Sequence, residues 1–273
     1  MPKQRPAVLL RDSAMIVAMF AAYFFFFALG AIVASFVGVV AARLNTGSSF
    51  LAGRSHCDAC NAPLAPLALV PILSYFLYRG RASCCGARIS VIAPFTEFLL
   101  GALFLLAYLQ VGFTPALPLV LLVLSLLLAL VLYDCAHQIL PLSILGLFVF
   151  ASAATAFLLS PSQASFAVTI SVAAAIGGFL AIIHFASRGR AMGFSDAPLA
   201  FGLSLFAGPD AIPGFVFSFW VGAVIGICIL ARRPRGSRMG VEVPFAPFLA
   251  AGFLLAYFTQ WNPFILLRSF PGL

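Results

Sequence analysis

The strongest constraint on this chain is a series of long apolar runs that carry no charge. Residues 14–42 contain no Asp, Glu, Lys or Arg. As a helix rising about 1.5 Å per residue, this run is longer than the roughly 30 Å hydrocarbon core of a bilayer requires. It also exceeds the apolar core of roughly 7–15 residues in a signal peptide, so we interpret it as a retained first span. Further runs of about 20 residues predict a helical membrane protein rather than an outer-membrane barrel.

Composition supports the same class. The chain is 63% hydrophobic and 8% charged, whereas soluble domains are about half apolar and about one quarter charged. The net charge of +8 is compatible with nucleic-acid binding. Arg residues in the short loops of a membrane protein have a simpler role, however, which is to set its orientation. We therefore expect the lipid bilayer as a partner, and no nucleic acid.

Pro, Gly and charged residues divide the chain into about eight predicted transmembrane helices. The predicted fold is all-α and polytopic, with a small cytoplasmic Cys-containing insertion between helices one and two. We expect three parts: residues 1–42 as the N-terminus and first helix, 43–90 as the Cys-containing loop domain, and 91–273 as a transmembrane domain. The predicted spans are 14–42, 91–109, the stretch from the turn at 112–115 to 133, 141–159, 164–186, 197–206, 212–231 and 244–267.

The basic residues predict which side of the membrane each loop faces. If the spans alternate, eleven of the fifteen basic residues fall on one side and four on the other. The positive-inside rule makes the first side cytoplasmic. Asp134 and Asp196, at ends of the third and sixth spans, then both lie at the cytoplasmic boundary, and Glu97 lies on the same side. The eleven residues are Arg43, Arg54, Arg79, Arg81, Arg88, Arg188, Arg190, Arg232, Arg233, Arg235 and Arg238.

Asp134 and Asp196 are the leading candidates for catalytic residues. A carboxylate beside hydrocarbon is costly and usually has a function. Two carboxylates close together share a proton, so that one donates it while the other activates water. This pattern favours an aspartic peptidase pair, and Gly193 would allow close approach of the backbone near it. The alternative is two unrelated interfacial acids, each capping a helix or pairing with an Arg.

Four cysteines lie in the polar insertion. Cys57 and Cys60 form a C-x-x-C, and Cys84 with Cys85 follows in the same loop. Paired knuckles of this kind bind tetrahedral zinc. Adjacent cysteines rarely both reach one metal, which leaves His56 as a further candidate ligand. The alternative is a set of reduced cytoplasmic thiols without a metal.

Three other polar residues lie on or beside the apolar spans. Glu97 inside the second span needs a partner, which is either a nearby Arg or a functional site. His137 follows Asp134 by three residues and either tunes the pair or is an ordinary polar group at a helix end. We assign His184 to packing.

The order and spacing of these motifs resemble the type IV prepilin peptidase family over nearly the whole chain. Asp134 and Asp196 correspond to its two catalytic positions, and Glu97 to the glutamate of its second span. The other matching segments are Gly30–Leu44, Arg54–Cys60, Val70–Tyr75, Arg79–Arg81, Cys85–Ser90, His137 to Pro141, and Pro244–Leu249.

The resemblance implies a membrane aspartic endopeptidase in the bacterial inner membrane, with its catalytic side cytoplasmic. Residues 91–273 would be the peptidase domain. The substrates would be prepilins or pseudopilins of type IV pili or type II secretion, cleaved at the leader peptide. The family also N-methylates the new N-terminus with S-adenosylmethionine, and this implies substrate or methyl-transfer roles for Glu97, Gly80 and Gly193. Structural zinc would be held by Cys57, Cys60, Cys85 and Cys84.

The chain departs from the family pattern at four positions, one of which is Gly38 in the first span, where the family usually has Asn. Ser195 replaces the second Gly of a Gly-x-Gly-Asp motif, Pro198 stands where the family has Lys, and Ala82 stands where it has the third Cys. We expect the Cβ of Ser195 to restrict how the backbone beside Asp196 meets the substrate, which would affect the rate more than the type of reaction. Two alternatives therefore stay open. One is a transporter-like protein whose interfacial acids bind a proton or cation, and the other is an impaired pilus or secretion assembly protein.

Overall fold

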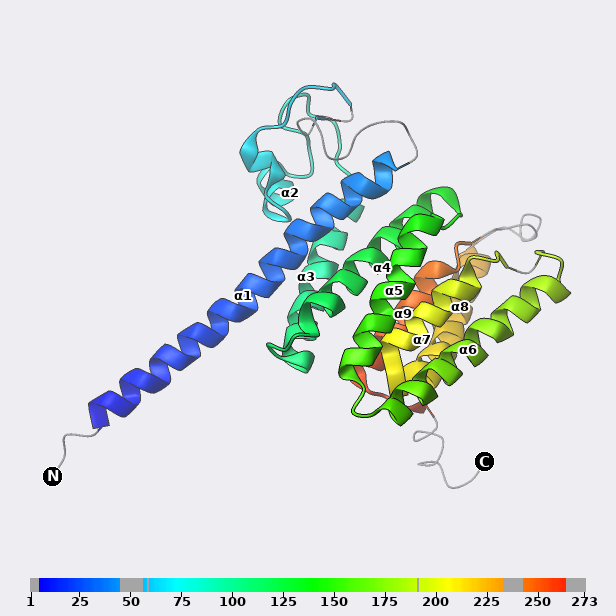
Figure 1. Cartoon of the computed structure of the whole chain (residues 1–273). Helices are drawn as coiled ribbons and strands as arrows, with labels where there is room; N and C mark the ends of the chain where they lie inside the picture. Colours follow the sequence, from blue (N-terminus) through cyan, green and yellow to red (C-terminus); the bar gives the residue numbers. More distant parts are fainter. Residues whose placement is uncertain (1–4, 45–55, 58, 191, 233–242, 264–273) are drawn as a thin grey trace. The chain divides into compact units, whose positions relative to one another are not determined.

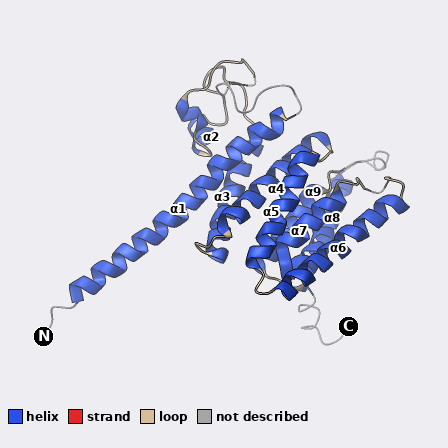
Figure 2. Cartoon of the chain, in the orientation of Figure 1, coloured by secondary structure: helices blue, strands red, loops and turns tan. Residues whose placement is uncertain are grey.

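The computed structural model describes residues 5–44, 56–57, 59–190, 192–232 and 243–263. Their regular elements are helices, with isolated β-bridges in the Cys-containing loop, which confirms the all-α prediction (Figures 1 and 2). The chain divides into two compact units, residues 1–113 and 114–273. The basic residues Arg54, Arg233, Arg235 and Arg238 lie outside the described residues, as does the predicted end of the last span.

The first unit is built on two apolar helices, α1 (Arg5–Arg43) and α3 (Ile92–Val111). Glycines let their backbones approach closely: a Cβ on Gly30 would lie 2.6 Å from the Leu100 carbonyl oxygen, and one on Gly101 would lie 2.8 Å from that of Phe27. Small residues at such crossings are typical of membrane helix pairs. Between the two helices lies the Cys-containing loop with a 3₁₀ turn, η1 (Pro66–Leu69), and the short helix α2 (Leu73–Leu77).

The second unit surrounds a short helix, α7 (Asp196–Ala207), with longer ones. Ten of the twelve residues of α7 are buried. It packs against the helices α5, α6, α8 and α9, and Asp196 is its first residue. The surrounding helices expose Phe, Leu and Ile side chains, as a surface facing lipid requires. The other elements are α4 (Leu117–His137), α5 (Leu142–Leu159), α6 (Gln163–Ala186), η2 (Gly208–Asp210), α8 (Ala211–Arg232) and α9 (Ala246–Thr259).

The helices account for the predicted spans. Six helical stretches among the described residues are long and apolar enough to cross a membrane, and one of them, Asp196–Ile229, contains α7 and most of α8. The 14-residue α9 brings the apolar helices of the described residues to eight, namely α1 and α3 to α9. These correspond to the eight predicted spans. The chain is therefore a multi-pass membrane protein with a Cys-containing insertion between its first two long helices.

Candidate active site

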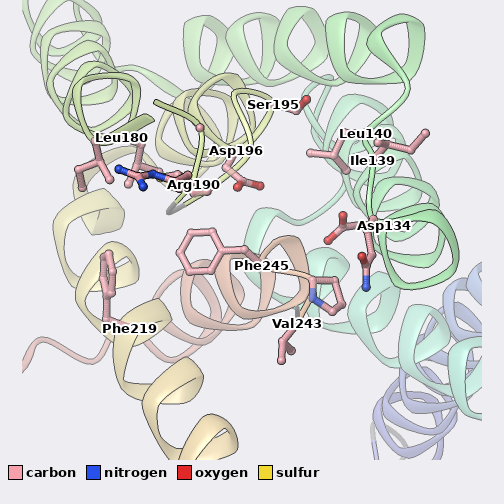
Figure 3. A pocket seen from close by; sticks show the side chains of 16 residues that line it. Asp134, Ile139, Leu140, Leu180, Arg190, Ser195, Asp196, Phe219, Val243 and Phe245 are labelled. Carbon is pink, nitrogen blue, oxygen red and sulfur yellow. The ribbon is translucent and has the colours of Figure 1, made fainter. Parts of the chain in front are cut away.

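Asp134 and Asp196 line one cavity of about 690 Å³ in the second unit. Both side chains are buried, with 6% and 8% of their surfaces exposed. Figure 3 shows their carboxylates directed into the same space between the helix ends. The walls come from the ends of α4 and α6, the loop before α7, α8 and the segment that precedes α9. They include Gln138, Leu140, Arg190, Phe219 and Phe245. The structure thus brings the two predicted acids together.

The end of α4 places Asp134 at the cavity. The helix stops because Gln138 adopts the left-handed conformation (φ 55°), in which its N–H donates to the Asp134 carbonyl oxygen at 2.8 Å. Pro141, in an extended conformation, directly precedes the next helix, α5. His137 packs its ring against Tyr133, with ring centroids 4.4 Å apart, and it is not among the cavity residues.

The carboxylate of Asp134 is held by the N-terminus of α9. Its Oδ2 accepts a hydrogen bond of 3.2 Å from the backbone N–H of Ala246, the first residue of that helix. Pro247 has no N–H, and the next amide, of Phe248, already donates to the Phe245 carbonyl. The N-terminus of a helix favours negative charge because its first amides lack partners within the helix. Sequence reasoning did not identify Ala246 as a contact of Asp134.

Asp196 is held by the loop that precedes it. The backbone amide of Gly193 hydrogen-bonds its carboxylate, and the Asp134 carboxyl group and the His184 imidazole lie close enough to act on it electrostatically. A Cβ on Gly193 would meet the Asp196 Oδ2 at an ordinary 3.7 Å. Gly193 is therefore part of the site through its N–H rather than through its lack of a side chain.

Ser195 and Pro198, which depart from the family pattern beside Asp196, are both compatible with the backbone conformation at their positions. Ser195 has φ −63° and ψ −19°, a helical conformation that any residue adopts, so the expected restriction by its Cβ does not arise from backbone conformation. Pro198 is the third residue of α7, where a helix N–H has no partner within the helix, so its missing donor costs little.

The four loop cysteines form one cluster in the first unit. Their sulfur atoms lie within 4.8 Å of one another, with 3.7 Å between Cys57 and Cys85 and 3.3 Å between Cys60 and Cys84. Tetrahedral zinc with Zn–S bonds of about 2.3 Å separates its sulfurs by roughly 3.8 Å, so the cluster fits a metal ion. The adjacent residues Cys84 and Cys85 both belong to the cluster, although adjacent cysteines were expected only rarely to reach the same metal. His56 is not one of its members among the described residues.

Two tight turns present these sulfurs. The turn after Cys57 closes through the Asn61 amide, 2.8 Å from the Cys57 carbonyl, and the turn after Ala82 closes through the Gly86 amide at the same distance. Hydrogen bonds from the amides of Ala59 and Cys60 lower the pKa of the Cys57 thiol to about 7. Amides that stabilise a thiolate favour metal binding, because the thiolate is the form that binds.

Glu97 has a partner other than the Arg considered from sequence. This buried residue of α3 accepts a 2.6 Å hydrogen bond from the backbone N–H of Ile72 through Oε2. Ile72 has φ 61° and ψ −55°, unusual for a β-branched residue. Further along the segment, Gly80 has φ 69°, and a Cβ there would lie 3.0 Å from the Tyr75 ring. Glu97 and Gly80 thus shape the loop segment 71–80, in the unit that also holds the cysteines.

Comparison with known proteins gives a consistent result. The family model described as "Bacterial Peptidase A24 N-terminal domain" matches residues 28–111. The chain is 32% identical over 232 residues to "Prepilin leader peptidase/N-methyltransferase" of Bacillus subtilis (strain 168), covering 85% of this chain and 92% of that protein.

Proteins of the same name from Myxococcus xanthus (strain DK1622) and Legionella pneumophila are 35% and 30% identical. These matches cover 77% and 75% of this chain, and 64% and 72% of those proteins. No solved structure matches it. Because the match to the Bacillus subtilis protein covers almost the whole of both chains, this chain belongs to the prepilin leader peptidase/N-methyltransferase family.

Proposed function

We propose that this protein cleaves the leader peptide of type IV prepilins or pseudopilins by an aspartic mechanism, with Asp134 and Asp196 as the catalytic pair. The observation that carries the proposal is the presence of two buried carboxyl groups, from separate helix ends, in one cavity. The names of the relatives support the substrate and the reaction.

The proposed chemistry uses the pair as one proton-sharing unit. The ionised carboxylate takes a proton from water as its oxygen attacks the scissile carbonyl, and the protonated partner donates its hydrogen to the carbonyl oxygen. Collapse of the tetrahedral intermediate breaks the C–N bond, and the proton taken from water passes to the leaving amine. The amides of Ala246 and Gly193 orient one carboxylate each. The pair titrates as a unit, so neither residue is assigned a fixed role.

We further propose the inner membrane as the location, with the cavity at the cytoplasmic face. The eleven-to-four distribution of basic residues supports this orientation. Residues 91–273 would form the peptidase domain, 43–90 the cytoplasmic loop domain, and 1–42 the N-terminus and first span. The apolar helix of a substrate would lie in the bilayer beside the enzyme, with its basic leader in the cytoplasm.

The loop domain is proposed to hold zinc and to serve the second activity in the relatives' names, N-methylation. Cys57, Cys60, Cys84 and Cys85 would hold the metal, which would fasten the two turns to each other. S-adenosylmethionine would supply the methyl group when bound. Glu97 and Gly80 would contribute by shaping segment 71–80, whereas Gly193 would contribute to the cleavage site through its amide.

The test is cleavage of a prepilin by the purified full-length chain in lipid vesicles. Asp134→Asn and Asp196→Asn should each lower kcat by at least about a thousandfold, because each removes one of two acids that act as a unit. The double variant should be no slower than either single one. Asp210→Asn changes a half-buried carboxyl just past the other end of α7 and should cleave at the wild-type rate. Substantial cleavage by Asp196→Asn would end the aspartic proposal.

A further inference from the structure

His184 does more than pack in α6. It lies two residues before the last residue of this helix, and its Nδ1 is 3.0 Å from the carbonyl oxygen of Met192. A carbonyl oxygen only accepts hydrogen bonds, so Nδ1 must carry the hydrogen and donate it. The contact joins the end of α6 to the loop 187–195, which leads into α7.

The carbonyl of Met192 and the amide of Gly193 belong to the same peptide group. That group is planar and, in this chain, trans, so its C=O and N–H point in opposite directions. His184 donates to the oxygen on one side, and the N–H on the other side hydrogen-bonds the Asp196 carboxylate. One peptide plane thus connects the imidazole to the carboxylate, and rotation of that plane would turn a carbonyl oxygen towards Asp196.

His184 also holds the loop at both of its ends. Its carbonyl oxygen accepts hydrogen bonds from the Gly189 amide at 2.9 Å and from the Ser187 hydroxyl at 3.1 Å. Gly189 has φ 75°, and a Cβ there would lie 3.3 Å from the imidazole Cε1. The imidazole ring packs edge-on against Phe194, with centroids 5.5 Å apart. The contacts of this one residue therefore span the loop from its first residue to the second before Asp196.

From these contacts we propose that His184 is a positioning residue for Asp196. It orients the Met192–Gly193 peptide so that the Gly193 N–H faces the carboxylate. This inference rests on the proposed function, because it gives His184 its role through a catalytic Asp196. Hydrogen bonds in such a chain polarise and strengthen one another, so the imidazole supports the Gly193–Asp196 contact without touching the substrate.

Two substitutions separate the hydrogen bond from the packing. His184→Phe keeps an aromatic ring against Phe194 but has no donor. His184→Asn loses the ring but carries an amide N–H close to the position of Nδ1. We expect kcat for prepilin cleavage to fall about tenfold or more in His184→Phe with KM nearly unchanged, because a small displacement of a reacting group costs rate. His184→Asn should stay within about threefold of the wild type by the same argument.

Trypsin provides a readout that does not depend on activity. Arg188 and Arg190 are exposed in the loop, so the loop should be cut faster in His184→Phe than in the wild type or His184→Asn. Ser171→Ala removes a side-chain hydrogen bond elsewhere on α6 and should change neither cleavage of the prepilin nor trypsin sensitivity.

The outcomes distinguish this inference from the function on which it rests. Four outcomes would each overturn the positioning role. Two concern kcat: no change in His184→Phe, or an equal loss in His184→Phe and His184→Asn. The other two are an effect of His184→Phe on KM instead of kcat, and an unchanged rate of trypsin cleavage in that variant. Asp196→Asn is measured beside them. If it cleaves normally, the catalytic role of Asp196 fails. If it is inactive while His184→Phe is normal, only the inference about His184 fails.

Discussion

Ser195 directly precedes Asp196 with ordinary helical dihedral angles. Glycine is required where a backbone has positive φ or where another group approaches too closely for a Cβ, and Ser195 has no positive φ. Its side chain lies in the wall of the cavity. The site therefore accepts Ser at this position without distorting the start of α7.

Reverting Ser195 to the residue usual in the family should consequently have a small effect. We expect the kcat/KM of Ser195→Gly for prepilin cleavage to lie within about threefold of the wild type, since no strain is released. Thermal unfolding of the variant in detergent shows whether the extra backbone freedom lowers stability. A gain of tenfold or more in kcat/KM would contradict this account and identify Ser195 as an obstacle to the substrate.

The limits of sequence reasoning are clearest at the same scale. Asp134, Asp196 and the cysteines could be predicted because charge in an apolar chain and Cys spacing are visible in residue types. The contacts of Ala246 and His184 could not be predicted in this way. Each is made with a backbone N–H or C=O group, and the residue type does not reveal which of these groups a side chain will meet. The partner of Glu97 is likewise a backbone N–H from a residue 25 positions away, and no spacing rule predicts it.

At the scale of elements, close approaches between helices hold the second unit together. A Cβ on Gly252 of α9 would collide with the backbone of Ser218 on α8. The Ser218 hydroxyl donates to the Gly214 carbonyl at 2.8 Å and contacts the Leu249 carbonyl across the interface at 3.2 Å. This contact sets the distance between α8 and α9. It therefore also helps to place the first amide of α9, which holds Asp134.

Gly252→Ala should therefore separate the two helices and lower the free energy of unfolding by about 1–3 kcal/mol, the usual cost of overpacking. Gly226→Ala is the matched control, because nothing lies within 4 Å of a Cβ built there, and Ala in a helix is neutral or stabilising. The measurement is thermal unfolding of both variants in the same detergent. Equal unfolding temperatures would argue against the packing described for α8 and α9.

The Cys-containing loop between α1 and α3 gives a second prediction at this scale. If its four sulfurs hold zinc, the purified chain should contain about one zinc ion per molecule, as a four-ligand site implies. Cys60→Ser should lose most of that metal. Cys228→Ser changes an exposed thiol on α8 outside the cluster and should keep it. Elemental analysis decides, and a zinc content near zero in the wild type would refute the metal site.

At the scale of the whole molecule, the testable property is which loops share a side of the membrane. Reporter fusions after Arg88 and Arg190 should read cytoplasmic, and one after Pro161 should read external, because the basic residues favour that orientation. A fusion after Arg238, outside the described residues, should also read cytoplasmic. An external signal after Arg190 would place Asp196 on the wrong face for a cytoplasmic leader.

The short length of α7 has a consequence for where the reaction takes place. Its twelve residues extend about 18 Å, against a hydrocarbon core of roughly 30 Å. The 14 residues of α9, which hold the other carboxylate, extend about 21 Å. Because longer helices enclose α7, its short length is accommodated inside the protein and not by thinning of the lipid around it. The scissile bond of a prepilin would then be cut in a recess of the protein itself, the cavity at the start of α7, and not in a depression of the lipid.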